Sequence, residues 1–271
     1  MASIILSLVT MSLLQWHNSF KEPVRIISLV PSLTEYLWAL GLEQEVVGIT
    51  KFCIHPISWW KQKTRVGGTK KVDFQVIRSL EPTLIIANKE ENTKEDIEQL
   101  QQDYEVLLTD ISSLDEAFFY LQEIGKKVNR AAEASTLLDE IQTAYQKAAN
   151  LFQGATFLYF IWRDPYFVVG PNTYIHALLT HFGLVNSCEI ARYPNLSAVF
   201  EPGTEKRLSP DYIFLSSEPF PFQAAHIAEI QALFPEAKIK LVDGEICSWY
   251  GVRMQKVPSY LESLMAKNQT G

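Results

Sequence analysis

The sequence is poor in cysteine and lacks the short motifs that mark common catalytic sites. Cys53, Cys188 and Cys247 are its three cysteines, and no Cys-x-x-Cys pair occurs, which argues against a structural zinc site. One disulfide and three free thiols both fit this count. No P-loop, Gly-x-Gly-x-x-Gly, Gly-x-Ser-x-Gly or His-Glu-x-x-His motif is present. The five histidines lack the spacing of metal ligands, so we predict neither a resident metal nor an enzyme.

Blocks of basic residues are also absent. The 24 lysines and arginines are outnumbered by 31 aspartates and glutamates, which gives a net charge of −7. A protein that binds nucleic acid needs a concentrated basic surface, so we expect no nucleic-acid partner. Apolar residues make up 47% and charged residues 20% of the 271 positions. This composition is typical of a soluble globular chain, long enough for two modest domains or one large domain.

The first 23 residues hold the one segment with features of a targeting signal. Residues 1–16, MASIILSLVTMSLLQW, are apolar, but no lysine or arginine precedes them and no small-x-small cleavage site follows. These features match a signal peptide poorly, and the stretch is too short to cross a bilayer. A buried first strand is the competing interpretation, and the sequence leaves both open.

From residue 24 the chain alternates short apolar strands with amphipathic helices. Val24–Val30 is rich in β-branched residues and predicts a buried strand. Ser32 and Glu35 then have the spacing of a capping box at a helix start. Further strands are predicted at Glu45–Thr50, Thr83–Lys89 and Tyr104–Asp110. This alternation predicts a parallel sheet covered by helices, a Rossmann-like α/β lobe over residues 24–129.

Residues 112–152 break the alternation because they are helical almost throughout. Ser113 and Glu116 repeat the capping-box pattern, and from Ala131 the apolar residues recur at the spacing of one helix face. A helix of about 22 residues is roughly 33 Å long, enough to reach across a second domain. We therefore predict a connecting helix at residues 130–152, with a single large domain as the alternative.

Residues 153–271 resume the alternation and predict a second α/β lobe. Its strands are predicted at Ala155–Ile161, Tyr166–Gly170, Asp211–Ser217 and Lys238–Asp243. The segments SLEPTLIIANKE at 79–90 and RLSPDYIFLSSE at 207–218 share Leu-x-Pro, an apolar strand and an acidic turn, which indicates an internal duplication. The predicted fold class is α/β, with two Rossmann-like lobes, mostly parallel sheets and one long helix joining them.

Ligands of parallel α/β sheets bind outside the carboxyl ends of the strands. The residues that follow predicted strands are therefore candidate ligand contacts: Pro31, Ser32, Asn88, Lys89, Glu90, Trp162, Arg163, Ser217, Trp249, Tyr250 and Arg253. His55 is the histidine best placed for a cleft. Two aromatic turns with an arginine in each favour a flat or conjugated ligand with acidic edges. Core packing of single aromatic residues, and helix capping by Glu90 and Glu91, are the alternatives.

Four segments together carry a family resemblance. RIISLVPSLTEYLWALG at 25–41, VVGITKFCIHP at 46–56, TRVGGTKKVDFQVIRSLEPTLIIANKEEN at 64–92 and LSPDYIFLSSEPFPF at 208–222 are the segments concerned. They resemble the cobalamin, siderophore and haem class of ABC-transporter substrate-binding proteins. These are the helical-backbone metal receptors, which have the class III periplasmic-binding-protein fold.

The resemblance implies a substrate-binding protein of an ABC-type importer, monomeric, periplasmic or extracytoplasmic, and without an intrinsic cofactor. Its ligand would be a metal chelate of the cobalamin, haem or ferric-siderophore kind, held in a cleft between the lobes. Cobalamin binders of the family stack their ligand on two tryptophans, whose positions match Thr69 and Asn88. Tyr166 and Tyr193, with Trp162, Trp249 and Tyr250, are candidates to replace those tryptophans.

The resemblance also implies docking on a membrane permease through one surface glutamate on each lobe. The first of these positions matches Gln75, with Asp73 nearby. The second falls near Glu201 to Glu205. Because glutamine stands at the first position, the sequence supports permease docking less directly than ligand binding.

Two rival hypotheses remain open. A nitrogenase-like two-lobed enzyme that handles a metal cluster would bring Cys53, His55 or the Glu90–Glu91 pair together on a metal or substrate. The three cysteines meeting in the cleft would favour this enzyme, whereas scattered and buried thiols would count against it. A cytoplasmic sensor of corrinoids or other metal chelates would need neither a permease nor a signal sequence.

Overall fold

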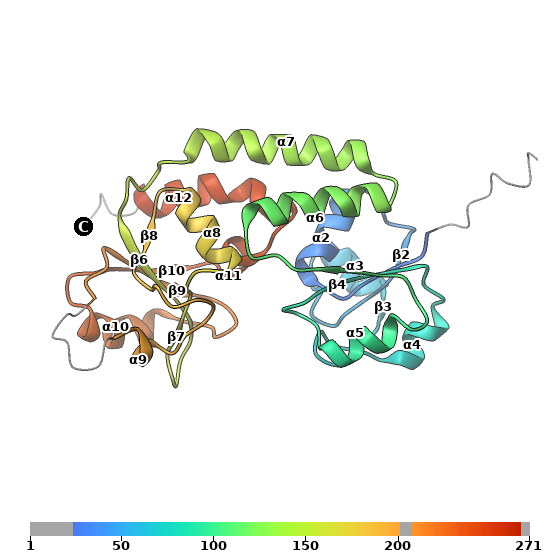
Figure 1. Cartoon of the computed structure of the whole chain (residues 1–271), viewed down its shortest axis with the longest axis horizontal. Coiled ribbons are helices and arrows are strands. Elements are labelled where there is room, and N and C mark those ends of the chain that lie inside the picture. Colours follow the sequence, from blue (N-terminus) through green and yellow to red (C-terminus); the bar gives the residue numbers. More distant parts are fainter. Residues whose placement is uncertain (1–23, 201–207, 267–271) are drawn as a thin grey trace, which may run out of the picture.

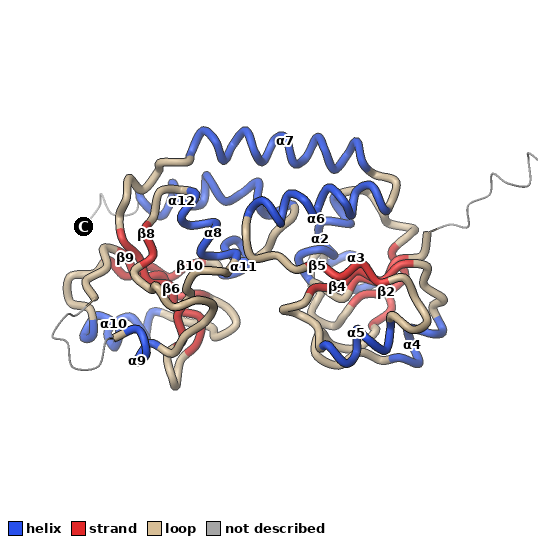
Figure 2. Tube along the Cα trace, viewed as in Figure 1, coloured by secondary structure: helices blue, strands red, loops and turns tan. Residues whose placement is uncertain are grey.

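The structure is a computed structural model that describes residues 24–200 and 208–266. The predicted apolar segment 1–23 and the predicted docking residues Glu201 and Glu205 lie outside these ranges. Two α/β lobes, each built on a five-stranded sheet, lie side by side beneath one long helix (Figure 1). Figure 2 shows the strands of each lobe between layers of helices. None of the helices described has the length and apolarity that a membrane crossing requires.

The first lobe holds a parallel sheet with the strand order β3-β2-β1-β4-β5. Its strands are β1 Ile26–Ser28, β2 Val46–Ile49, β3 Thr64–Arg65, β4 Leu84–Asn88 and β5 Val106–Thr109. Ile26 and Ile27 point to opposite faces of β1, as strand geometry requires, and each is buried in a different apolar cluster. Helices therefore cover both faces: α2 Pro31–Ala39, α3 Ile57–Gln62, α4 Phe74–Ser79, α5 Lys94–Leu100 and α6 Leu114–Lys127.

The second lobe holds a mixed sheet with the order β10-β9-β6-β7, and β8 also pairs with β6. Its strands are β6 Thr156–Trp162, β7 Phe167–Val168, β8 Val185–Asn186, β9 Tyr212–Ser216 and β10 Lys238–Val242. β7 runs antiparallel to β6, so residues 163–166 form a hairpin turn rather than a connection to a helix. The helices are α8 Tyr174–His181, α9 Leu196–Val199, η1 Ala224–His226, α10 Ile227–Leu233, α11 Gly244–Ser248, η2 Val252–Lys256 and α12 Val257–Ala266.

Helix α7 (Ala131–Ala148) runs over both lobes along the top of Figure 1. Its buried residues Ala134, Leu138, Ile141 and Tyr145 have the spacing of one helix face. The helix packs against α6 of the first lobe and against η2 and α12 of the second. A long helix is therefore present where the sequence predicts one, but it ends at Ala148 rather than at residue 152. The division at 24–129, 130–152 and 153–271 stays a prediction.

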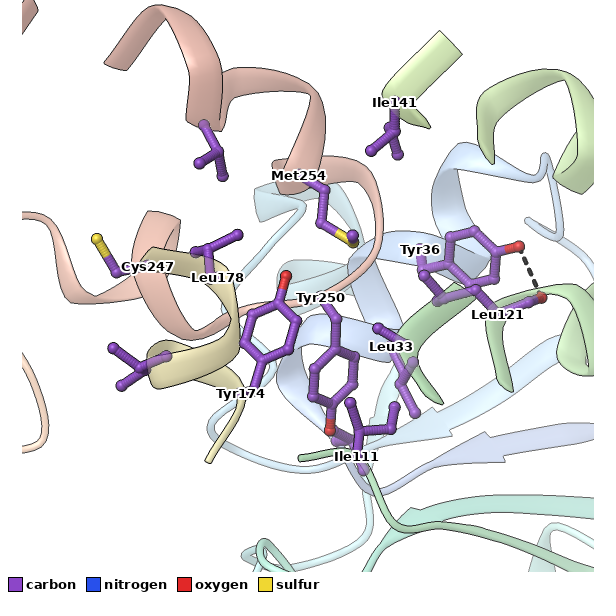
Figure 3. Close-up of a cluster of buried hydrophobic side chains, with 14 of the residues drawn as sticks. Leu33, Tyr36, Ile111, Leu121, Ile141, Tyr174, Leu178, Cys247, Tyr250 and Met254 are labelled. Carbon is purple, nitrogen blue, oxygen red and sulfur yellow. Dashed lines mark hydrogen bonds between the residues drawn. The ribbon is translucent and has the colours of Figure 1, made fainter. Parts of the chain in front are cut away.

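One apolar cluster continues from the first lobe into the second (Figure 3). The hydroxyl of Tyr36 in α2 donates a hydrogen bond to the carbonyl oxygen of Leu121 in α6, 2.9 Å away. Tyr174 and Tyr250 of the second lobe meet edge to face, with ring centroids 5.6 Å apart, in the same cluster as Ile111 of the first. Because close-packed side chains resist separation, this cluster stabilises the relative orientation of the two lobes.

Two helix starts test the predicted capping boxes. α2 begins at Pro31, and no side chain caps it, so the prediction of Ser32 as the N-cap is wrong. Proline suits the first helical position because that position needs no N–H group. α6 begins after Ser113, whose hydroxyl accepts a hydrogen bond from the backbone N–H of Glu116 at 3.2 Å, as predicted. The carboxylate of Glu116 accepts from the backbone N–H of Ser112 rather than from that of Ser113.

Candidate functional site

A cleft of about 940 Å³ lies between the lobes and is lined by both, a volume typical of small-molecule sites. The first lobe contributes Pro31, Ser32, Phe52, Ile54, Thr69, Lys70, Asn88, Lys89, Glu90, Glu91 and Ile111. The second contributes Ile161, Tyr174, Ile175, Arg192, Tyr193, Glu218, Pro219, Glu245, Ser248, Trp249 and Tyr250. Most of these residues follow strands, as the strand-end rule predicts.

Nine of the fifteen predicted contact residues line this cleft: Pro31, Ser32, Thr69, Asn88, Lys89, Glu90, Tyr193, Trp249 and Tyr250. The other six do not: His55, Trp162, Arg163, Tyr166, Ser217 and Arg253. The ring of His55 is edge-on to that of Trp249, with 5.9 Å between centroids, and its Nε2 lies 3.4 Å from Glu245. His55 thus contacts two residues of the cleft wall without lining the cleft itself. The exposed Ser217 accepts a hydrogen bond from the backbone N–H of Gly244.

Trp162, Arg163 and Tyr166 form a separate cluster on the β6–β7 hairpin. The guanidinium of Arg163 pairs with the carboxylate of Glu229 in α10 at 3.1 Å, and the hydroxyl of Tyr166 donates to the same carboxylate. Trp162 is 43% exposed and packs edge-on against Phe220. The structure does not bring these three predicted contact residues to the cleft.

Buried amide side chains hold the turn that follows β4. Asn88 is 2% exposed, and its Oδ1 accepts hydrogen bonds from the backbone N–H groups of Glu90 and Glu91 at 2.9 and 3.2 Å. Its Nδ2 donates to the hydroxyl of Thr109, 3.0 Å away. Asn92 accepts from the backbone N–H of Asn88. Because its hydrogen bonds are made within the protein, the Asn88 side chain holds the backbone that presents the two glutamates.

Hydroxyl groups hold the corresponding turn after β9. The Oγ of Ser216 accepts hydrogen bonds from the Tyr159 hydroxyl at 3.1 Å and from the backbone N–H of Glu218 at 3.3 Å. The Oε1 of Glu218 accepts from the hydroxyl of Ser248 at 2.9 Å and from Nε1 of Trp249 at 3.1 Å. Burial raises the pKa of Glu218 above its usual value even though these two bonds lower it.

Glu90 connects the two lobes across the cleft. One of its carboxylate oxygens lies 2.5 Å from the guanidinium of Arg192, and the other accepts a hydrogen bond from the hydroxyl of Tyr193 at 3.3 Å. Burial, reinforced by the charge of Glu90, raises the pKa of Tyr193. The phenol therefore stays protonated and donates to the carboxylate.

Arg253 lies behind Trp249 rather than in the cleft. It is 8% exposed, and its guanidinium pairs with Glu35 of α2 at 2.6 Å and with Glu245 of α11 at 2.8 Å. Its Cζ lies 4.6 Å from the ring centroid of Trp249, within cation–π range. Two carboxylates neutralise this arginine, so it ties the lobes together and supports the indole instead of offering a charge to a ligand.

Several cleft residues escaped the sequence analysis. Phe52 and Ile54 are 50% and 42% exposed and flank the fully buried Cys53. Because all three residues of Phe-Cys-Ile are apolar, no polar–apolar alternation in the sequence marks the outer two as exposed. Arg192 follows no strand named in the prediction, so the strand-end rule could not have found it.

The three thiols lie apart from one another. Cys53, Cys188 and Cys247 are all buried and unpaired. Cys53 accepts a hydrogen bond from the hydroxyl of Thr34 and shares one apolar cluster with Cys247, whereas Cys188 belongs to another. Burial raises the pKa of each thiol, that of Cys247 to about 12, which keeps them unreactive. Across residues 24–200 and 208–266, no three His, Cys, Asp or Glu side chains are grouped to hold a metal ion.

The predicted docking residues of the first lobe lie at the start of α4. Asp73 is the N-cap of this helix, and its carboxylate accepts hydrogen bonds from the backbone N–H groups of Gln75 and Val76, both at 3.1 Å. Such a cap stabilises the helix start, which gives Asp73 a structural role. Gln75 is exposed.

Two α/β lobes under one connecting helix, with a cleft at their facing strand ends, define a two-lobed solute-binding protein. Residues 26–235 match the family model described as periplasmic binding protein, and the chain belongs to that family. The periplasmic haem-binding protein HutB of Vibrio cholerae has the same fold, with a TM-score of 0.75 at 18% identity, covering 90% of this chain and 99% of that one. These findings confirm the predicted fold class.

Two relatives of known sequence extend the comparison. The chain is 28% identical over 170 residues to the uncharacterized ABC transporter substrate-binding lipoprotein YvrC of Bacillus subtilis (strain 168), covering 59% of this chain and 54% of that protein. It is 25% identical over 130 residues to the vitamin B12-binding protein of Vibrio vulnificus (strain CMCP6), covering 45% and 47% respectively. The chain thus spans about half the length of the curated relatives it matches.

Proposed function

We propose that this chain is the substrate-binding protein of an ABC-type importer and holds a cobalamin-like, haem-like or ferric-siderophore chelate between its lobes. The observation that carries the proposal is the cleft of about 940 Å³, which strand-end turns of both lobes build. Trp249, Tyr193 and Tyr250 give it aromatic faces that suit a flat or bulky ligand. Family membership and relatives named for ABC transport and for vitamin B12 support the proposal.

The same proposal includes the oligomeric state, the cellular location and the membrane partner of the protein. It acts as a monomer outside the cytoplasm, without an intrinsic cofactor and without enzymatic activity, and delivers its ligand to a membrane permease. The relative named as a lipoprotein and the neighbour named as periplasmic support this location. The metal-cluster enzyme loses its main argument, because the three thiols are buried and unpaired and none of them lines the cleft. A cytoplasmic chelate sensor is the competing assignment, and fractionation of cells that produce the protein separates the two.

Titration of the purified protein with cyanocobalamin, haemin and ferrioxamine B tests the ligand proposal. We expect at least one of them to change its absorption spectrum on binding and to raise the unfolding temperature of the protein. Ligand at a hundred times its Kd stabilises the folded state by about 2.7 kcal/mol, which thermal unfolding detects easily. Unchanged spectra and an unchanged unfolding temperature with all three would contradict the proposal.

A further inference from the structure

The charged side chains that line the cleft are unequal in number and in pairing. Its acidic side chains are Glu90, Glu91, Glu218 and Glu245. Its basic side chains are Lys70, Lys89 and Arg192. The kind of ligand that the cleft accepts depends on which of these charged side chains have no partner within the protein.

Two of the three cations are already paired with carboxylates of the protein. The Nζ of Lys89 lies 2.7 Å from the carboxylate of Asp110, and the guanidinium of Arg192 lies 2.5 Å from that of Glu90. The Nζ of Lys70 donates to the backbone carbonyl of Glu90 at 2.5 Å. A ligand carboxylate would have to displace a protein carboxylate from Lys89 or Arg192, and at Lys70 it would compete with the nearby charge of Glu91.

Two of the four glutamates are not matched in this way. Glu245 pairs with Arg253 and Glu90 with Arg192. Within the described ranges, neither Glu91 nor Glu218 makes an ion pair, and Glu91 makes no side-chain hydrogen bond. Both hydrogen bonds to Glu218 reach the same oxygen, Oε1. Its Oε2 therefore remains an open acceptor.

These two acceptors come from opposite walls. Glu91 follows β4 of the first lobe and Glu218 follows β9 of the second. Both are partly buried at the cleft. Burial raises the pKa of Glu91 above the usual glutamate value, although the charge of Lys70 lowers it, and burial also raises the pKa of Glu218. A ligand between the lobes thus meets, on either side, a carboxylate that has no ion-pair partner among the described residues.

We propose that the cleft selects a metal chelate whose edges carry neutral hydrogen-bond donors, such as carboxamide N–H groups, and rejects chelates with free carboxylates. The inference rests on the proposed function, because it names the ligand class of the same cleft. Donors that reach Glu91 and Glu218 form charge-assisted hydrogen bonds, whereas a ligand carboxylate at the same place is repelled. This reverses the expectation of acidic ligand edges, since Arg163 and Arg253, on which that expectation rested, lie outside the cleft.

A matched pair of corrins tests the selectivity without changing the macrocycle. Dicyanocobinamide carries amides around its edge, and dicyanocobyrinic acid carries carboxylates at the corresponding positions. We expect the amide form to bind about a hundred-fold more tightly at pH 7.5, because several donor contacts are exchanged for repulsion. Haemin and its bis-amide provide the same comparison on a porphyrin, for the case in which the cleft takes only a flat macrocycle.

The variant Glu91→Gln/Glu218→Gln keeps the shape of the walls and removes both charges. We expect its preference within each pair to fall below about ten-fold, chiefly through tighter binding of the carboxylate form. Glu229→Gln, which neutralises a glutamate of the outer hairpin cluster, serves as the control and should retain the wild-type preference. Thermal unfolding of each variant establishes that it is folded before the affinities are compared.

The outcomes separate this inference from the proposed function. Equal binding within a pair, tighter binding of the carboxylate form, or an unchanged preference in the double variant would overturn the inference alone. Failure of every probe to bind would overturn the proposed function, and the inference with it. Glu90→Gln gives a further check, because it releases Arg192 and should improve binding of the carboxylate forms in particular.

Discussion

Two turns of the second lobe have similar compositions and lie in different surroundings. Trp162–Tyr166 and Trp249–Arg253 each contain a tryptophan, a tyrosine and an arginine, and the sequence predicts ligand contacts in both. The structure places Trp249 and Tyr250 in the cleft. It places Arg163 and Tyr166 against Glu229, away from the cleft.

Strand direction explains the difference between the two turns. β7 returns antiparallel to β6, so residues 163–166 are the tip of a hairpin. β10 lies parallel to β9 and is followed by α11, whose N-cap Asp243 accepts a hydrogen bond from the backbone N–H of Ile246. The chain after α11 then passes along the cleft. Residue types alone therefore do not define a site, because the rule about strand ends applies only where parallel strands continue into helices.

The largest expected difference between the two turns is in stability. Arg253→Met leaves Glu35 and Glu245 as partly buried carboxylates without a cation, which we expect to lower the free energy of unfolding by about 3 kcal/mol. Arg163→Met should lower it too little to separate from the wild-type value, because its partner Glu229 is 42% exposed and solvent replaces the lost charge. Urea unfolding of both variants measures the contrast. Equal losses would show that Arg253 does not connect the lobes in the way described.

Long periodic elements could be predicted from the sequence, and short ones could not. All four strands predicted in the first lobe are present, and α7 differs from its prediction by four residues at its end. The helices α3, α9 and α11 have six, four and five residues, too few to show a helical repeat. The strand β3 has two residues and exists because β2 offers it an edge, which a local pattern cannot reveal.

Site residues that directly follow parallel strands could be predicted from the sequence. Site residues whose role depends on an ion pair with a distant part of the chain could not. Pro31, Asn88 and Glu90 lie at strand ends and line the cleft. The partner of Glu90 is Arg192, 102 positions along the chain, and no local rule joins them. The sequence shows that Arg253 is basic, but not that two carboxylates already neutralise it. Charge available to a ligand is a property of the folded cleft.

The two tryptophans should differ in their effect on binding. Trp249→Ala removes an aromatic face of the cleft, and we expect it to raise the Kd of the bound chelate about ten- to hundred-fold. Trp162→Ala should leave the Kd unchanged within about two-fold, because that side chain is 43% exposed on the hairpin. Spectroscopic titration gives both constants. If Trp249→Ala instead lowers the free energy of unfolding by about 3–5 kcal/mol, the indole acts as a core residue.

The smallest expected difference between the two turns is in the pH-dependent stability that a neighbouring glutamate contributes. This glutamate is Glu218 beside the turn that lines the cleft and Glu229 beside the hairpin turn. Burial raises the pKa of Glu218, the hydrogen bond from Ser248 lowers it, and its ordinary value is 4.5. The folded chain therefore holds this proton more tightly than the unfolded chain does, and the stability that results is present below pH 4.5 and lost as pH rises through the raised pKa. Glu218→Gln avoids this loss, so we expect its unfolding temperature at pH 7 to exceed that of the wild type by about 1–3 °C.

Glu229, beside the other turn, should respond with the opposite sign. The hydrogen bond from Tyr166 lowers its pKa, and the guanidinium of Arg163 lowers it further. Its contribution to stability is therefore present above the ordinary value of 4.5 and is lost as pH falls through the lowered pKa. Glu229→Gln removes that contribution, so its unfolding temperature at pH 7 should fall slightly. Thermal unfolding of both variants between pH 3 and about 8 covers both windows. If both variants change the unfolding temperature in the same direction, the two carboxylates have similar surroundings. The two turns would then differ only in their position relative to the cleft.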